Sequence, residues 1–133
     1  MELEAIDFEA GDVKKNSTTP PKTINTNIAI TSAETEANLI TVKFNYTATY
    51  SPDESYIRII GRARFRDKDA KKMQEEWSKT GRIAGEQGEI VLNAINYNAS
   101  MNAIFISKAF NLAAPVVLPT LKFGAAPKAK KKK

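Results

Sequence analysis

The sequence predicts an α+β fold in which a four-stranded antiparallel sheet packs on a long C-terminal helix. Three observations lead to this prediction. Apolar and polar residues alternate in four segments before residue 67, the apolar spacing then becomes that of a helix, and a long apolar stretch follows. A chain of 133 residues suits one domain, which we place at residues 1–123, followed by a disordered lysine-rich tail at 124–133.

The first two predicted strands flank a polar loop. In residues 4–12 apolar side chains alternate with acidic ones, the pattern of a half-buried strand. Residues 27–37 form a weaker strand, with Ile28 and Ile30 on one side. Two consecutive prolines interrupt the polar segment between these strands, so we expect a loop there.

The next two strands form the clearest pattern in the chain. Residues 38–50 place Ile40, Val42, Phe44, Tyr46, Ala48 and Tyr50 on one side and mostly Thr, Lys and Asn on the other. Residues 56–66 alternate in the same way, with arginines on their polar side. The short segment between them contains Pro52 and Asp53, which favour a turn. The two segments therefore predict an antiparallel hairpin.

Two helices are expected after the sheet. Residues 67–81 carry a helical apolar stripe, with Asp67 or Asp69 as the N-cap and Gly81 as the stop. A second helix is predicted from about Glu89 to Asn111. It has apolar residues on two sides and only a narrow polar stripe, whereas a surface helix has a wide polar face. A second subunit is the expected cover, with hydrogen bonds across the stripe fixing the pairing. The predicted oligomer interface is Asn93, Asn96, Ser100 and Ser107.

The composition excludes several kinds of chemistry. The chain has no cysteine and no histidine, which removes disulfides, thiolate or imidazole zinc sites and histidine-based triads. Glycine-bearing residues 81–89 lack the lysine and the spacing of a phosphate-binding loop. Acidic pairs such as Asp67/Asp69 are explained by helix capping and a solvated helix face. We therefore predict no catalytic residue, metal or cofactor.

The formal net charge of +5 comes from the tail. Five lysines follow residue 127, and the remaining basic and acidic residues are equal in number. Such a tail can bind nucleic acid or another polyanion electrostatically, or it can be a solubilising extension. The arginine row of residues 56–66 offers a second basic surface, or an exposed sheet face with cross-strand partners.

No targeting or membrane-spanning segment is predicted. The N-terminus is acidic and alternating, unlike a signal peptide. The apolar stretch from Ile90 to Leu112 is long enough to span a bilayer, but its asparagines, serines and Lys108 make insertion costly. We expect a soluble, cytoplasmic protein.

The order of elements resembles that of the SecB family of export chaperones. The resemblance is carried by IDFEAGD at residues 6–12, by the hairpin LITVKFNYTATYSPDESYIRIIGRARF and by the run INYNASMNAIFISKAFNLAAPVVLPTLKF, a helix followed by an apolar, proline-bearing arm. It covers roughly residues 4 to 123. The family's acidic docking face and its second C-terminal helix have no clear counterpart, so the chain resembles a divergent member.

This resemblance implies a homotetramer, built as a dimer of dimers, that holds non-native polypeptide in hydrophobic grooves without ATP. The chain's surplus of aromatic and aliphatic residues also suits such a groove. The candidate peptide-binding residues are Phe44, Tyr46, Tyr50, Trp77, Phe110, Val116 and Leu118.

The sequence therefore favours an ATP-independent chaperone for unfolded or nascent chains, with a role in protein export as one extension. Two alternatives stay open. One is a nucleic-acid or ribosome-associated protein that uses the arginine strand and the lysine tail. The other is a purely structural oligomer in which the long helix serves as interface.

Overall fold

The computed structural model describes residues 1–17 and 20–115. In this range the chain forms the strands β1 (Glu2–Lys14), β2 (Thr23–Glu36), β3 (Leu39–Ser51) and β4 (Tyr56–Arg66), and the helices α1 (Ala70–Thr80) and α2 (Gly85–Ala109). The predicted α+β class, with an antiparallel sheet followed by helices, is confirmed. The predicted lysine-rich tail and the arm that contains Val116 and Leu118 lie outside the described residues.

The four strands form one antiparallel sheet in the order β1-β4-β3-β2. β2–β3 and β3–β4 are hairpins, and β1 pairs with the outer side of β4, which makes β1 and β2 the two edges. Both edge strands are longer than predicted. Their polar ends continue to pair after the apolar alternation has stopped, as where Thr23 lies opposite Ser51 and Lys14 opposite Tyr56.

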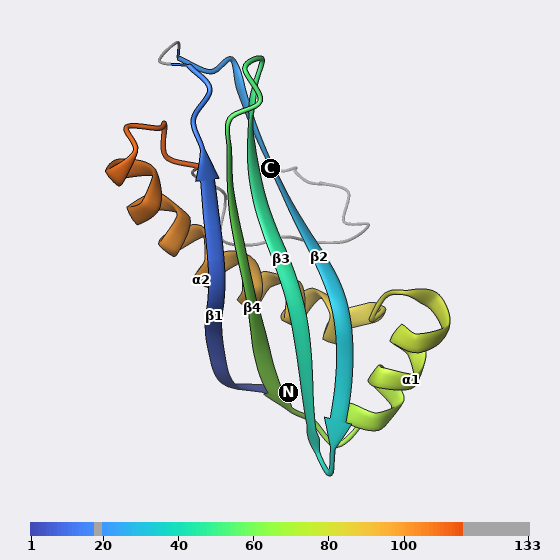
Figure 1. Ribbon diagram of the computed structural model, residues 1–133. Coiled ribbons are helices and arrows are strands. Elements are labelled where there is room, and N and C mark those ends of the chain that lie inside the picture. The colour runs from blue at the N-terminus through green and yellow to red at the C-terminus, as the bar shows by residue number, and fades with distance from the viewer. Residues whose placement is uncertain (18–19, 116–133) are drawn as a thin grey trace, which may run out of the picture.

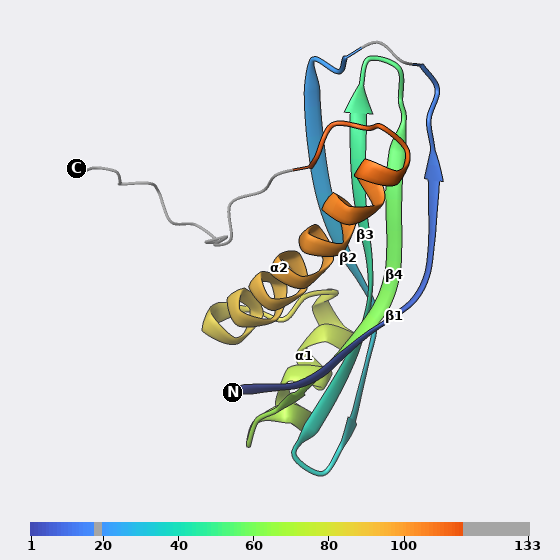
Figure 2. The same cartoon turned by 90° about the vertical axis from the view of Figure 1, so that its left-hand side faces the viewer.

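Both helices lie on one face of the sheet, and no described helix covers the other (Figures 1 and 2). The alternation of β3 explains this arrangement, because every second side chain from Ile40 to Tyr50 is at most 1% exposed on the helix side. β4 contributes Ile57, Ile59, Ala63 and Phe65 to the same core. The hydrophobic core thus lies between the two central strands and the helices.

α1 ends where the sequence predicts, at Gly81, whose φ of 80° is the left-handed conformation that glycine favours at helix ends. Asp69 is the N-cap residue, and the Asp67 carboxylate accepts a hydrogen bond from its amide at 2.7 Å. α2 begins at Gly85, earlier than the predicted Glu89, and crosses the sheet obliquely (Figure 1). Its side chains Val91 and Ile95 are fully buried against the sheet.

Candidate functional site

Three of the predicted peptide-binding residues are core residues. Phe44 and Tyr46 are 0% exposed and Tyr50 is 1% exposed, because all three lie on the helix side of the central strand β3. The Tyr50 hydroxyl donates a hydrogen bond to the carbonyl oxygen of Ala113 at 2.5 Å, and Ser100 lies 3.5 Å from the Tyr46 hydroxyl. Burial raises the pKa of Tyr46, and burial together with the nearby Tyr46 raises the pKa of Tyr50 to about 12. In this fold the three side chains support the sheet and offer no surface to a peptide.

The other predicted peptide-binding residues lie elsewhere. Trp77 packs half-buried against the core from α1, and its indole Nε1 is buried without a hydrogen-bond partner among the described residues. Phe110, at the end of α2, is 47% exposed. Val116 and Leu118 lie outside the described residues. The described candidates therefore do not gather into one groove.

The polar stripe predicted as an oligomer interface faces the sheet of the same chain. Asn96, Ser100 and Ser107 are 1%, 6% and 0% exposed, whereas Asn93 is half-buried. Ser107 donates a hydrogen bond to the carbonyl of Ile104 at 2.6 Å, and Ser100 donates to the Asn96 side chain at 3.4 Å. Three of the four residues predicted to form the oligomer interface are therefore buried inside the subunit, and Ser100 and Ser107 make hydrogen bonds there.

The exposed side of α2 is apolar instead. Tyr97, Met101 and Phe105 are 53%, 46% and 69% exposed, and Ile90 continues the same line two turns earlier. Their spacing of seven, four and four residues places all of them on one helix face. We call this line the α2 stripe. Its members belong to one of the two apolar sides that the sequence predicts for this helix.

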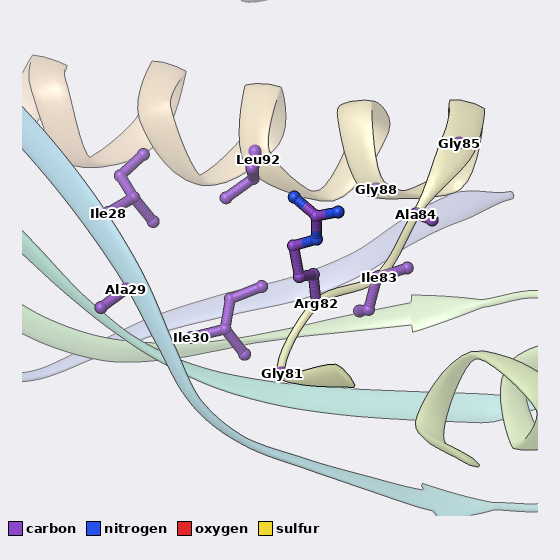
Figure 3. Close-up of a pocket in the computed structure, with 10 residues that line it drawn as sticks. All are labelled: Ile28, Ala29, Ile30, Gly81, Arg82, Ile83, Ala84, Gly85, Gly88 and Leu92. Carbon is purple, nitrogen blue, oxygen red and sulfur yellow. The ribbon is translucent and has the colours of Figure 1, made fainter. Parts of the chain in front are cut away.

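An apolar pocket opens at the β2 edge of the sheet, where the sequence pattern predicts no site. It encloses about 460 Å³ between β2, residues 81–84 (which connect α1 to α2) and the start of α2 (Figure 3). The larger lining side chains are Ile28, Ile30, Arg82, Ile83 and Leu92. Its volume falls in the range of roughly 300–1,000 Å³ typical of ligand sites. Ile28 and Ile30 were visible in the sequence as one side of a weak strand, but their neighbours in the pocket come from distant segments.

Local backbone geometry shapes this pocket. Gly81 and Gly85 both have positive φ, which turns the connection sharply at each end. A Cβ atom added at Gly88 would lie 1.8 Å from the carbonyl oxygen of Ile83, so the connection packs directly on the first turns of α2. This close approach buries Ile83, which is 6% exposed, whereas the adjacent Arg82 is exposed, and both residues line the pocket.

The arginine row of β4 lies on the open face and is largely neutralised. Arg58 pairs with Asp12 of β1 at 3.7 Å, Arg62 with Glu9, and Arg66 with Glu4 at 2.6 Å. The register that sets β1 beside β4 creates this ladder, because the acidic residues of the N-terminal strand face the arginines across the pair. The row is therefore a mixed-charge surface and not a basic patch.

Within the described part of the chain, no group of three or more Asp or Glu side chains is placed to hold a metal ion. None of the helices formed by residues 1–17 and 20–115 has the length and hydrophobicity needed to cross a membrane.

The strand order, the antiparallel pairing and the location of both helices on one face define an SecB-like α+β fold. Among solved structures, the Rv1957 SecB-like chaperone of Mycobacterium tuberculosis, in complex with a ChAD peptide from the Rv1956 HigA1 antitoxin, has a TM-score of 0.55. The alignment covers 93% of this chain and 89% of that one, at 11% identity. The likeness is therefore one of fold.

A protein of unknown function from Streptococcus agalactiae aligns over 92% of this chain and 100% of that one, at 13% identity. Its TM-score of 0.40 is too low to indicate a common fold. No protein-family model and no curated protein matches the sequence.

Proposed function

We propose that the protein is an ATP-independent chaperone that binds extended, apolar segments of non-native polypeptide. The observation that carries the proposal is an aliphatic pocket beside an edge strand of the sheet. An edge strand offers unpaired backbone N–H and C=O groups to an incoming chain, while the pocket receives alternate side chains. Clients are selected in this way by hydrophobicity and extension, two properties that unfolded chains share.

The SecB-like fold supports this proposal, because the similar chaperone was solved with a bound peptide. The chemistry of the pocket agrees with such a role. Burial of apolar client surface contributes about 25 cal/mol per Å² before the entropic cost of ordering the client. A pocket of about 460 Å³ holds only a few side chains, so each subunit would bind a short segment weakly, and several subunits together would hold one client.

We further propose that a second copy of the chain covers the α2 stripe. A continuous line of exposed Ile90, Tyr97, Met101 and Phe105 is costly in water and is typical of an interface. The stripe lies on the side of α2 opposite the residues that pack on the sheet, so a partner helix can reach it without disturbing the core. A dimer or a tetramer built in this way presents the pockets of all its subunits to one client.

The test combines client protection with a matched pair of variants. Ile28 points into the pocket, and its neighbour Asn27 is exposed on the opposite face of β2. We expect Ile28→Asp to lose most of the ability to suppress aggregation of a reduced, unfolded client, and Asn27→Asp to retain it. Leu92→Gln tests the other wall of the pocket if Ile28→Asp lowers the melting temperature. Full protection by both pocket variants would contradict the proposed site.

The alternative functions predict different results in the same preparation. A structural oligomer would form a stable assembly that protects no client. A nucleic-acid-binding protein would bind RNA with a steep dependence on salt. The pairing of Arg58, Arg62 and Arg66 with carboxylates of β1 argues against the second alternative for the described surface.

A further inference from the structure

The apolar pocket has a single charged residue in its lining. Of the ten residues that line it, nine are aliphatic or glycine, and the tenth is Arg82. Figure 3 shows the Arg82 side chain extending from the connection between the helices toward α2. The residue is exposed, so its guanidinium is open to a bound ligand at the mouth of the pocket.

Arg82, like Arg64 of β4, has no ionic partner within the described part of the chain. Arg58, Arg62 and Arg66 each pair with a carboxylate of β1, but no such pair involves Arg82. Two acidic residues lie near it in sequence. The Glu76 carboxylate accepts a hydrogen bond from the amide of Ala84 at 3.2 Å, and Glu86 lies on the first turn of α2 and lines a different, more polar pocket.

We propose that this pocket selects apolar segments that carry an acidic side chain at one end, with the carboxylate paired to Arg82. The inference rests on the proposed chaperone function and specifies its substrate class. An extended chain places alternate residues on one face at a spacing of roughly 6.6 Å. Two aliphatic residues can therefore enter beside Ile28 and Ile30, while an acidic residue two positions further along reaches the mouth. Guanidinium and carboxylate groups form a paired, charge-assisted contact that a neutral side chain cannot reproduce.

The first measurement compares peptides that differ at one position. Peptides with the same alternating aliphatic residues would carry Glu, Gln or Lys at the N-terminal or the C-terminal flank. Calorimetry measures the binding, because Trp77, the only tryptophan of the chain, is not among the residues that line the pocket. At one of the two flanks, we expect the peptide with Glu to bind about five- to tenfold more tightly than the peptide with Gln at the same position. The peptide with Lys there should bind least well. The preference should shrink at high salt, because the site is exposed.

Variants of the full chain assign the preference to one residue. Arg82→Gln should make the Glu and Gln peptides equal, and Arg82→Glu should reverse the order in favour of Lys. Arg64→Gln is the matched control, since Arg64 is exposed on the open face of the sheet and its loss changes the net charge equally. Equal binding of Glu and Gln peptides by the unmodified chain would overturn the acidic preference and leave the chaperone proposal standing. Failure of every peptide to bind would remove both.

Discussion

At the scale of single residues, the packing of β1 depends on a glycine. Gly61 of β4 lies opposite both Phe8 and Phe44, and these two rings meet edge to face across it with their centroids 6.1 Å apart. A Cβ atom at this position would lie 2.3 Å from the carbonyl oxygen of Asp7 and 3.0 Å from the ring of Phe44. The edge strand can approach the sheet here only because the position has no side chain.

We therefore expect Gly61→Ala to lower the free energy of unfolding by about 1–3 kcal/mol, the usual cost of overpacking. Urea unfolding followed by circular dichroism measures it. Arg64→Ala on the same strand is the control, since exposed substitutions usually change stability by less than about 0.5 kcal/mol. An equal effect of the two substitutions would show that β1 is not held at this point.

A second residue-scale prediction concerns alkaline pH. The pKa of Tyr50 is raised to about 12 in the folded chain, mainly by burial, whereas a tyrosine in an unfolded chain has a pKa of about 10. Between these values the unfolded state loses the proton and the folded state keeps it. The contribution of Tyr50 to the free energy of unfolding is therefore fully present below about pH 10. It falls as the pH rises toward 12, by an amount on the order of 2 kcal/mol.

Urea unfolding at several pH values from 8 to 12 measures this loss. Tyr50→Phe should flatten the alkaline slope, although it also removes the hydrogen bond to Ala113 and lowers stability at every pH. Tyr97→Phe serves as the control, because that side chain is 53% exposed on α2. A slope that Tyr50→Phe leaves unchanged would show that other groups cause the loss.

At the scale of elements, the sequence predicted the strands better than the role of the long helix. Alternation locates β3 and β4 because one face of each strand is buried and the other is not. In α2 both sides are apolar, so periodicity alone cannot indicate which side the sheet covers. The structure packs Val91, Ile95 and the Asn/Ser stripe inward and turns Tyr97 and Phe105 outward, and only the position of the sheet decides between these orientations.

The exposed α2 stripe predicts how the subunits assemble. Phe105 is the most exposed of its members, at 69%, so Phe105→Asp should place a charge inside the proposed interface and reduce the mass measured by light scattering. Asn102→Asp, exposed on the same helix but beside the stripe, should leave the mass unchanged. A protein that is monomeric before any substitution would contradict the assembly directly.

At the scale of the whole molecule, the fold class could be predicted because it depends on patterns along the chain, whereas the pocket could not. Ile28, Ile83 and Leu92 come from three different segments and meet only because the connection at Gly81 and Gly85 folds back under α2. The resemblance to the SecB family implies Phe44, Tyr46 and Tyr50 as peptide-binding candidates, but large apolar side chains on a central strand are most often core.

The distribution of charge over the whole chain gives the last prediction. The five lysines after residue 127 account for the entire net charge of +5, and three of the four arginines of β4 are paired with acidic residues of β1. A chain truncated after Pro127 should therefore lose most of any RNA binding seen at low salt, because the truncation removes the entire net positive charge. The same truncation should leave client protection unchanged, because the pocket lies in the remaining chain. If truncation abolishes both client protection and RNA binding, the tail takes part in client capture. If RNA binding survives truncation undiminished, the arginine row binds RNA in spite of its ion pairs.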